Sequence, residues 1–402
     1  MPRAAASSPV ARIPRSGIRT LMDLALGDPS AIHLEIGEPD AGPAEHVVAA
    51  VAAAARDGRT GYTSSTGLVE LRVAAAERVA RTHGRATSPD EVVVTHGAMH
   101  GLAMAMATLL APGDEVLLPD PTFPNWEMAA VAAGAAVRTY PAHAAAGFVP
   151  DPAEVASRVT PRTRALVVCS PNNPTGAVYP PDVVAGLVEV ARRHDLWLLS
   201  DECYEAITFD RPHVSPLAYD TDGRVLGFFS VSKTYALTGW RTGWVVVPAP
   251  DVVEALGHLA EATVACPSTP GQVAALAALT GPQDGVADAV ASYRERRDAA
   301  CALLARRGVA HVVPDGAFYL MVDVGTSDTD AFARGLLARR HVAVAPGSTF
   351  GTAAAGMVRV SLAAPRDQLL LGLERLADEV ADPTGTAGRP LAVVGPAAVE
   401  DA

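Results

Sequence analysis

The sequence predicts an α/β protein, in which a large domain carries a mostly parallel sheet flanked by helices and a smaller α/β domain packs beside it. Between roughly residues 90 and 250, short apolar runs alternate with longer helical patterns, and the runs turn polar only at their carboxyl ends. Continuous Val/Leu runs of this kind are typical of strands buried on both faces of a parallel sheet. After about residue 285 a long charged helix opens a second α/β unit.

The strands of the large domain are expected where apolar runs end in polar residues, and the helices where the longer patterns follow them. In chain order, the expected elements are a strand at "EVVVTHG" (91–97), a helix over 98–110, the strand "DEVLLPDP" (114–121), a helix over 125–133, the strand "RALVVCSPNNP" (164–174), a helix over 181–194, and the strands "LWLLSDE" (196–202), "VLGFFSVS" (225–232) and "RTGWVVVP" (241–248).

The small domain is expected to combine both ends of the chain, because the 40 or so N-terminal residues lack a sheet of their own and should pack with the C-terminal third. The C-terminal elements expected are a helix that includes "YRERRDAACALLARRG", the strands "AFYLMVDV", "HVAVAPG" and "MVRVSLA", a helix between the first two of these strands, and a last helix over 365–380. The predicted divisions are a flexible arm (1–17), the N-terminal part of the small domain (18–45), the large domain (46–285), the C-terminal small domain (286–381) and a disordered, Pro/Gly-rich tail (382–402).

Composition narrows the class of protein. The 402 residues are 49% hydrophobic and 19% charged, which is enough for a sizeable core. A net charge of −12 disfavours nucleic acid or an anionic membrane as the partner. Four cysteines stand far apart with no CxxC pair, no apolar run reaches membrane-spanning length, and the N-terminus lacks the apolar core of a signal peptide. These features predict a cytoplasmic location.

The lysine content is the most unusual feature of the chain. Of its 32 Lys and Arg residues, only Lys233 is a lysine, in the stretch "SVSKTYALTGWRTGW". Arginine can replace lysine where a positive charge or a hydrogen-bonding fork is needed, but it cannot form an imine with a carbonyl compound. Lys233 is therefore a candidate nucleophile, although one lysine surviving by chance in an arginine-rich chain is the alternative.

Several groups near the ends of these strands suit a phosphorylated aldehyde. Gly97 and Ala98 stand at a strand-to-helix junction, where free amides favour an anion, although most such junctions are only tight turns. Ser230 and Ser232 flank Lys233, and Arg241 follows eight residues later. Two hydroxyls, an amine and a guanidinium suit a phosphate and a carbonyl held together. Solvated loop residues are the alternative.

Two further strings carry polar side chains at strand ends. In "SDECYE", Asp201 can pair with a protonated ring nitrogen, with Tyr204 nearby, although an Asp at a strand end is more often a cap. "SPNNPTG" fixes a turn at Pro174 and Gly176 and directs Asn173 back to the sheet edge, and a plain turn would not need two asparagines.

Together these strings resemble the class I/II aminotransferases, the fold-type-I pyridoxal-phosphate enzymes of the aspartate aminotransferase superfamily. The resemblance runs in one order from about Ile18 to Asp378 and implies a seven-stranded type of sheet. The matching strings are "LEIGEPD" (34–40), "GYTSSTGLVELR" (61–72), "VTHGA" (94–98), "PTFPNW" (121–126), "SPNNPTG" (170–176), "SDECYE" (200–205), "SKTYALTGWRTGW" (232–244), "GAFYLMVDV" (316–324), "PGSTFG" (346–351) and "VRVSLA" (358–363).

The resemblance assigns roles to matching residues. It implies that Lys233 holds pyridoxal 5'-phosphate as a Schiff base, and that Asp201 pairs with the pyridine nitrogen. It also implies that Tyr204 and Asn173 contact the ring hydroxyl and that Phe123 stacks on the ring. The phosphate is implied to bind the backbone of Ala98 and Met99, the side chains of Ser230, Ser232 and Arg241, and Tyr62 of a second subunit. The substrate carboxylate is implied to bind Arg359, helped by Asn173 and the backbone of Gly37.

The implied activity is transfer of an amino group from an L-amino acid to a 2-oxo acid by a ping-pong mechanism, in a homodimer with shared sites. Met99 stands where some relatives that act on acidic substrates carry lysine, so a neutral, apolar or aromatic donor is favoured over aspartate, with 2-oxoglutarate or pyruvate as acceptor. Another arginine recognising an acidic side chain is the alternative. A lyase or cyclase of the same fold, or a non-catalytic sensor, are the alternative functions.

Overall fold

The computed structural model describes residues 11–382. Most of the predicted N-terminal arm, residues 1–10, and nearly all of the predicted tail, residues 383–402, lie outside the described residues. None of the helices in residues 11–382 combines the length and the apolar character that crossing a membrane requires.

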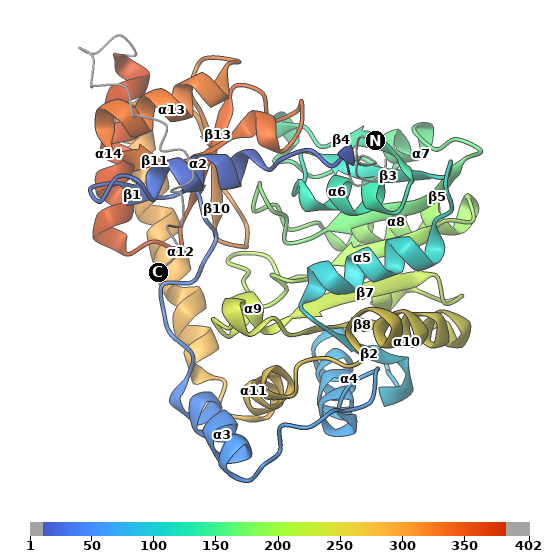
Figure 1. Ribbon diagram of the computed structural model, residues 1–402. Helices are drawn as coiled ribbons and strands as arrows, with labels where there is room; N and C mark the ends of the chain where they lie inside the picture. The colour runs from blue at the N-terminus through green and yellow to red at the C-terminus, as the bar shows by residue number, and fades with distance from the viewer. Residues whose placement is uncertain (1–10, 383–402) are drawn as a thin grey trace, which may run out of the picture.

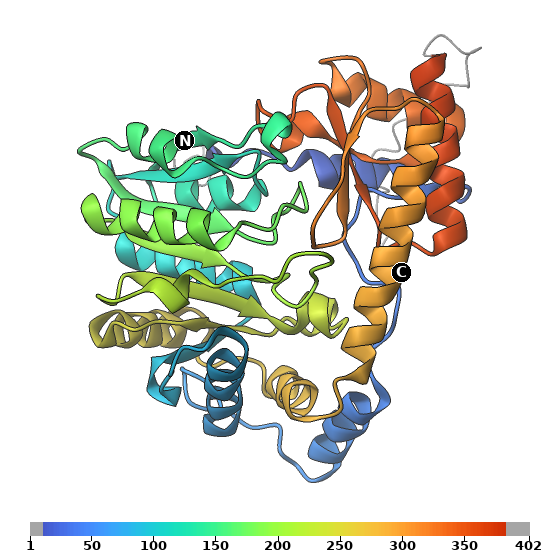
Figure 2. The ribbon, with the colours of Figure 1, turned by 180° about the vertical axis from the view of Figure 1, so that it is seen from behind.

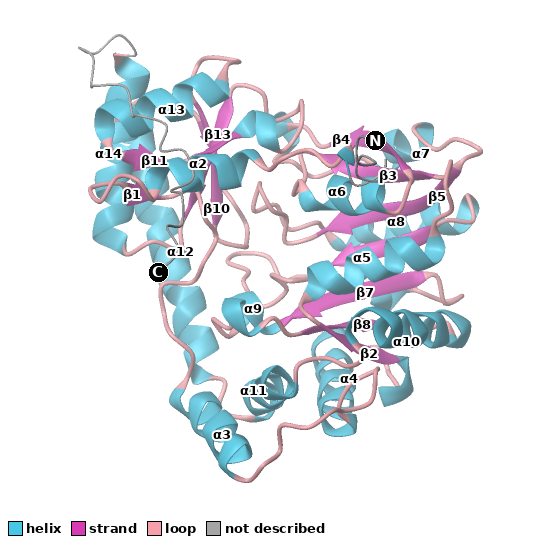
Figure 3. Ribbon diagram, viewed as in Figure 1, coloured by secondary structure: helices cyan, strands magenta, loops and turns pink. Residues whose placement is uncertain are grey.

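A seven-stranded sheet forms the centre of the described chain (Figures 1 and 3). Its order is β2-β8-β7-β6-β5-β3-β4, and every neighbouring pair is parallel except the two pairs that include β8. The predicted α/β class with a mostly parallel sheet is confirmed. The strands are β2 (Val92–Thr95), β3 (Glu115–Asp120), β4 (Ala136–Pro141), β5 (Thr163–Cys169), β6 (Trp197–Asp201), β7 (Val225–Ser230) and β8 (Gly243–Val246).

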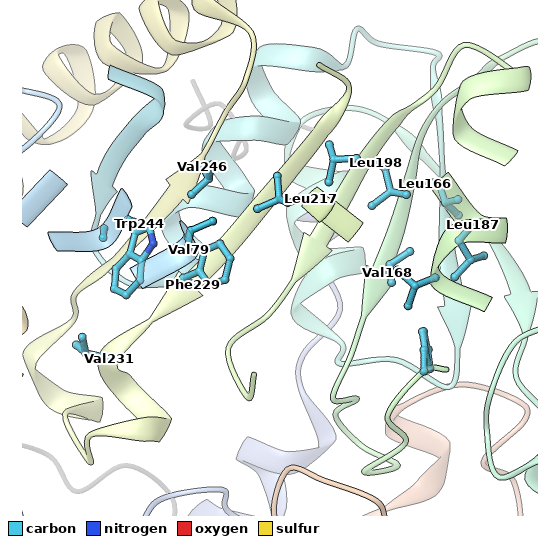
Figure 4. Packing of buried hydrophobic residues seen from close by; sticks show 14 of the residues in the cluster. Val79, Leu166, Val168, Leu187, Leu198, Leu217, Phe229, Val231, Trp244 and Val246 are labelled. Atoms are coloured by element: carbon cyan, nitrogen blue, oxygen red, sulfur yellow. The ribbon is translucent and has the colours of Figure 1, made fainter. Parts of the chain in front are cut away.

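Helices cover both faces of this sheet, and alternate strand residues supply the two cores. On β5, for example, Leu166 and Val168 enter one core, and Ala165 and Val167 enter the other. Figure 4 shows the first core, where Phe229 and Trp244 stack with ring centroids 5.7 Å apart. This core is covered by α4 (Val69–His83), α8 (Pro181–Arg193) and α11 (Thr269–Thr280), and the other by α5 (Ala98–Leu109), α6 (Asn125–Ala132) and α10 (Pro250–Val264).

A second group of elements brings the two ends of the described chain together. β1 (Ile32–His33) pairs in parallel with β11 (Val342–Ala343), and α2 (Gly17–Ala25) packs against α13 (Thr329–Arg340). The region predicted as one strand at "HVAVAPG" is divided between β11 and β12 (Ala345–Pro346), which belong to different sheets. The second sheet has the order β12-β13-β10-β9, with β9 (His311–Val312), β10 (Tyr319–Asp323) and β13 (Met357–Ser361).

Helix α12 (Asp284–Arg306) runs from the edge of the large sheet into this second group, where it packs on α14 (Arg366–Ala381) (Figure 2). The domain boundary expected at Gly285 falls in the first turn of α12. The remaining helical segments are α3 (Glu45–Arg56), α7 (Pro152–Ser157), α9 (Val231–Thr234) and the 3-10 turns at Pro89–Glu91, Ala144–Ala146, Pro216–Tyr219, Thr238–Trp240 and Gly347–Thr349. In Figure 1 the carboxyl end of β7 and the short helix α9 that follows it point toward the second group of elements.

Candidate active site

Lys233 lies at the carboxyl end of the central sheet, on the short helix α9 that directly follows β7. The Ser230 hydroxyl begins this helix by accepting a hydrogen bond from the Ser232 amide (3.0 Å). The Lys233 Nζ donates to the carbonyl of Gly37 (2.7 Å), which belongs to the N-terminal segment. The one lysine of the chain therefore points toward the N-terminal segment that joins β1 to α3.

A candidate anion site lies at the start of α5. Gly97 caps the helix with a φ of 80°, and the first amide to donate within the helix is that of His100, to the Gly97 carbonyl (3.1 Å). The amides of Ala98 and Met99 therefore precede the helical ladder, where the helix dipole favours an anion. A Cβ on Gly97 would come within 2.8 Å of Arg241 Nη2.

The hydroxyls predicted to hold a phosphate meet at the same place. Ser230 Oγ donates to Ser232 Oγ (2.8 Å), and Arg241 is exposed, with its Nη1 donating to the Thr238 carbonyl (2.6 Å). A Cβ on Gly243 would come within 2.9 Å of the Ala98 nitrogen. Glycine at position 243 therefore keeps the backbone amides at the start of α5 accessible. We call these amides, the hydroxyls of Ser230 and Ser232 and the guanidinium of Arg241 the cradle; such groups suit a phosphate dianion.

Asp201 is a buried carboxylate at the carboxyl end of β6. Its Oδ1 accepts a hydrogen bond from the Cys203 amide (3.2 Å), and none of the described basic side chains forms an ion pair with it. Burial raises the pKa of Asp201. A desolvated carboxylate without a cationic partner suits a protonated ring nitrogen.

Arg359, on β13, is 2% exposed. It donates to Asn173 Oδ1 (2.8 Å) and to the Glu35 carbonyl (2.5 Å), and its Nε has no partner among the described residues. Its Cζ lies 4.2 Å from the ring centroid of Tyr319. Burial lowers the pKa of Arg359. Within the described chain no carboxylate lies at ion-pair distance, so this buried guanidinium is available to an incoming carboxylate.

Tyr319 is a site residue that the sequence reasoning did not single out, although it lies within the matching string "GAFYLMVDV". Its hydroxyl bonds the hydroxyl of Tyr204 (2.8 Å), whose pKa burial raises well above its usual range. A Cβ on Gly37 would come within 1.8 Å of the Tyr319 hydroxyl oxygen, so the residue at 37 must be glycine. Phe350 was also not predicted, although it lies within the matching string "PGSTFG", because only its contact with Arg359 (4.9 Å) places it at the site.

The side chains of three predicted site residues pack on the core or are exposed in the single chain. Phe123 follows β3 and packs, partly buried, against both cores of the large sheet. Met99 packs on the core beneath α5. Tyr62 is 93% exposed, so the single chain does not bring its ring into the cradle.

The fold and the site define an enzyme that uses pyridoxal 5'-phosphate. The amides, hydroxyls and guanidinium of the cradle suit its phosphate, Asp201 suits its ring nitrogen, and the Lys233 amine suits its aldehyde. Comparison with known proteins gives the family: residues 29–376 match the model of aminotransferase class I and II. The chain belongs to this family and is an aminotransferase, which acts on amino acids and 2-oxo acids.

Individual relatives cover nearly the whole chain. A probable aspartate/prephenate aminotransferase of Thermus aquaticus is 40% identical over 355 residues, which span 86% of this chain and 90% of the relative. An arginine–pyruvate transaminase of Pseudomonas aeruginosa is 37% identical, over 86% of this chain and 88% of the relative. The structure of aspartate aminotransferase from Thermus thermophilus with maleate superposes with a TM-score of 0.90 at 36% identity, over 94% of this chain and 100% of that one.

Proposed function

We propose that this aminotransferase takes an amino group from an L-amino acid with a neutral, apolar or aromatic side chain and passes it to 2-oxoglutarate or pyruvate, in two half-reactions at Lys233. One observation carries the assignment. The Lys233 amine and the Arg359 guanidinium donate to carbonyls of the same short segment, those of Gly37 and Glu35. Two residues of chain span at most about 7 Å, and Glu35 and its neighbour lie in a bend. An amine and a carboxylate site this close suit a single α-amino acid.

The residues divide the work of the reaction. Bound pyridoxal phosphate supplies an aldehyde for amines and a ring that delocalises the electron pair left at the substrate Cα. Asp201 keeps the ring nitrogen protonated, and Tyr204 and Asn173 donate to the ring hydroxyl. Lys233, once free, removes the proton from the substrate Cα, while Arg359 holds the α-carboxylate so that this C–H bond stays within its reach.

The donor preference depends on charge near the site. Met99 places no positive charge at the start of α5, where one would favour an acidic donor. Glu38 follows Gly37 and accepts a hydrogen bond from Thr238 Oγ1 (2.6 Å), and its carboxylate disfavours a second substrate carboxylate. The relatives named above differ in substrate, which leaves the donor to experiment.

A half-reaction screen tests the proposed function. Each amino acid is added alone to the cofactor-loaded protein, and the absorbance of the bound cofactor is followed together with the released oxo acid. Lasting bleaching with one equivalent of oxo acid supports transamination and names the donor. Recovery of the band with pyruvate and ammonia accumulating would instead show a lyase. Lys233→Arg, which keeps the charge but cannot form an imine, is the matched control.

We also propose a cytoplasmic homodimer with shared sites. The exposed ring of Tyr62 supports sharing, because the resemblance to the family implies a role for this tyrosine at the phosphate of a second subunit. Four unpaired cysteines support a reducing compartment. A mixing experiment tests the dimer: Lys233→Ala and Tyr62→Ala chains are purified separately and refolded together. Recovery of activity in the mixture requires a site built from two chains, and a mixture no more active than its parts contradicts it.

A further inference from the structure

Asp120 connects the large sheet to the loop that carries Phe350. It ends β3, is 8% exposed, and accepts three hydrogen bonds from that loop, from the Thr352 amide (3.1 Å), the Thr352 hydroxyl (2.6 Å) and the Ala353 amide (3.0 Å). Among the described residues no basic side chain pairs with Asp120. Its charge is therefore stabilised by this loop, and charge-assisted bonds of this kind are the stronger ones.

The loop is shaped to receive this carboxylate. Gly351 has a φ of 131°, and a Cβ there would come within 2.1 Å of Asp120 Oδ1. A second bond joins the same two segments, since the Thr122 amide donates to the Phe350 carbonyl (2.8 Å). The loop is thus fixed to the end of β3 on both sides of Gly351.

Phe350 links this docking to the substrate site. It is 2% exposed, and its ring centroid lies 4.9 Å from Arg359 Cζ. The guanidinium has hydrogen-bond partners at Nη1 and Nη2 but none at Nε among the described residues, so its plane also depends on the aromatic rings packed against it. Moving Phe350 would leave room for Arg359 to rotate.

We propose that Asp120 is a positioning residue for substrate recognition: by docking the 350–353 loop it holds Phe350 against Arg359 and so fixes the guanidinium in the orientation that grips the α-carboxylate. The inference rests on the proposed role of Arg359. Because Phe123 follows Asp120 by three residues, the same contact also keeps the carboxylate site in register with the position expected to stack on the cofactor ring.

The test compares two substrates that differ only in the carboxylate. These are the donor named by the half-reaction screen and the amine obtained by replacing its carboxylate with hydrogen; for L-phenylalanine this amine is 2-phenylethylamine. Asp120→Asn and Gly351→Ala disturb the same contact from its two sides, so one of them suffices if the other fails to fold. Arg359→Lys serves as the reference for loss of carboxylate recognition.

Two control variants match these changes. Asp151→Asn alters an exposed aspartate that accepts a hydrogen bond from the Ala153 amide at the start of α7 (2.9 Å) and is not among the residues of the candidate site. Gly356→Ala places a side chain at a positive φ (87°) in the same loop region, where the nearest atom is 4.0 Å from the added Cβ. For both control variants, kcat and KM with the amino acid and with the amine should equal those of the parent.

For Asp120→Asn and Gly351→Ala we expect the KM of the amino acid to rise about tenfold with kcat within about twofold, as for loss of ground-state binding. The reaction rate with the amine should not change. If both variants slow amine and amino acid alike, or leave both unchanged while Arg359→Lys weakens the amino acid alone, the role of Asp120 is refuted and that of Arg359 stands. If Arg359→Lys itself does not discriminate between the two substrates, both roles are refuted.

Discussion

Glu205→Gln tests a buried ionic network next to the active site. Glu205 follows Tyr204 in the chain, and its side chain is 8% exposed. It accepts hydrogen bonds from Arg78 Nε (2.8 Å) and binds His83 Nε2 (2.5 Å). Burial alone would raise the pKa of Glu205, but Arg78 and His83 outweigh it and lower the pKa to about 2.

The magnitude follows from this pKa. Each tenfold change in proton affinity is worth about 1.4 kcal/mol, so the drop from 4.5 to about 2 corresponds to about 3 kcal/mol of folding free energy. Because the pKa is lowered in the folded state, the stabilisation is complete above pH 4.5 and is lost as the pH falls toward 2. Glutamine keeps the shape but not the charge, and leaves Arg78 buried without its counter-ion.

Denaturant unfolding at pH 7 and at a series of lower pH values measures the effect, at fixed concentrations of protein and cofactor because both shift apparent stability. We expect Glu205→Gln to lose about 3 kcal/mol at pH 7 and to show a shallower decline in acid. Glu189→Gln removes an exposed pair with Arg192 on α8 and should not shift the midpoint. A Glu205→Gln protein within about 1 kcal/mol of the parent, with the same acid profile, would refute the reasoning.

Four other outcomes are expected. Burial lowers the His83 pKa, but Glu205 and Glu202 outweigh burial and leave this pKa above 6.5. Stability gained from His83 is therefore lost as the pH rises above 6.5, and His83→Asn should reduce that loss. Thermal melts at a series of pH values measure this. Lys233→Arg should fold with unchanged circular dichroism yet form no borohydride-reducible adduct. Gly37→Ala should lower kcat/KM at least about tenfold by displacing Tyr319, and Arg359→Lys should raise KM about a hundredfold; steady-state kinetics check both.

Six of the seven strands of the large sheet could be located from sequence because each is a short apolar run with buried residues, and β3 and β6 lie within the predicted runs. The edge strand β4 was not predicted, because all but one of its residues are exposed or half-buried and it carries no continuous apolar run. The antiparallel direction of β8 could not be predicted, because a run of Gly-Trp-Val-Val reads the same in either direction. The division of "HVAVAPG" also escaped the pattern, since two residues of each strand are too few to show a period.

Site residues that stand in an unusual sequence setting could be predicted, and those recognisable only by their contacts could not. Lys233 is distinctive because it is the one lysine of the chain, whereas Asp201, at a strand end where a cap is the commoner role, gains its assignment from the string around it. Phe350 is an ordinary apolar residue of a core, and only its contact with Arg359 distinguishes it. Tyr319 is distinguished by its contacts with Arg359, Tyr204 and Gly37, which the sequence does not show. Asp120 would pass for a turn residue before a proline, and its role depends on a loop more than 200 positions later in the chain.

The single lysine gives the molecule an unusual chemical simplicity. All its other Lys/Arg positions are arginines, whose charge persists at any pH at which the protein stays folded and which do not react with ordinary acylating reagents. Acetylation and reductive methylation of side-chain amines are therefore confined to Lys233, so the mass increment on the peptide that contains Lys233 reports whether the active site is open. Amine-directed crosslinkers, by contrast, have no surface lysine with which to join neighbouring subunits, and contacts between chains must be mapped through carboxylates or thiols.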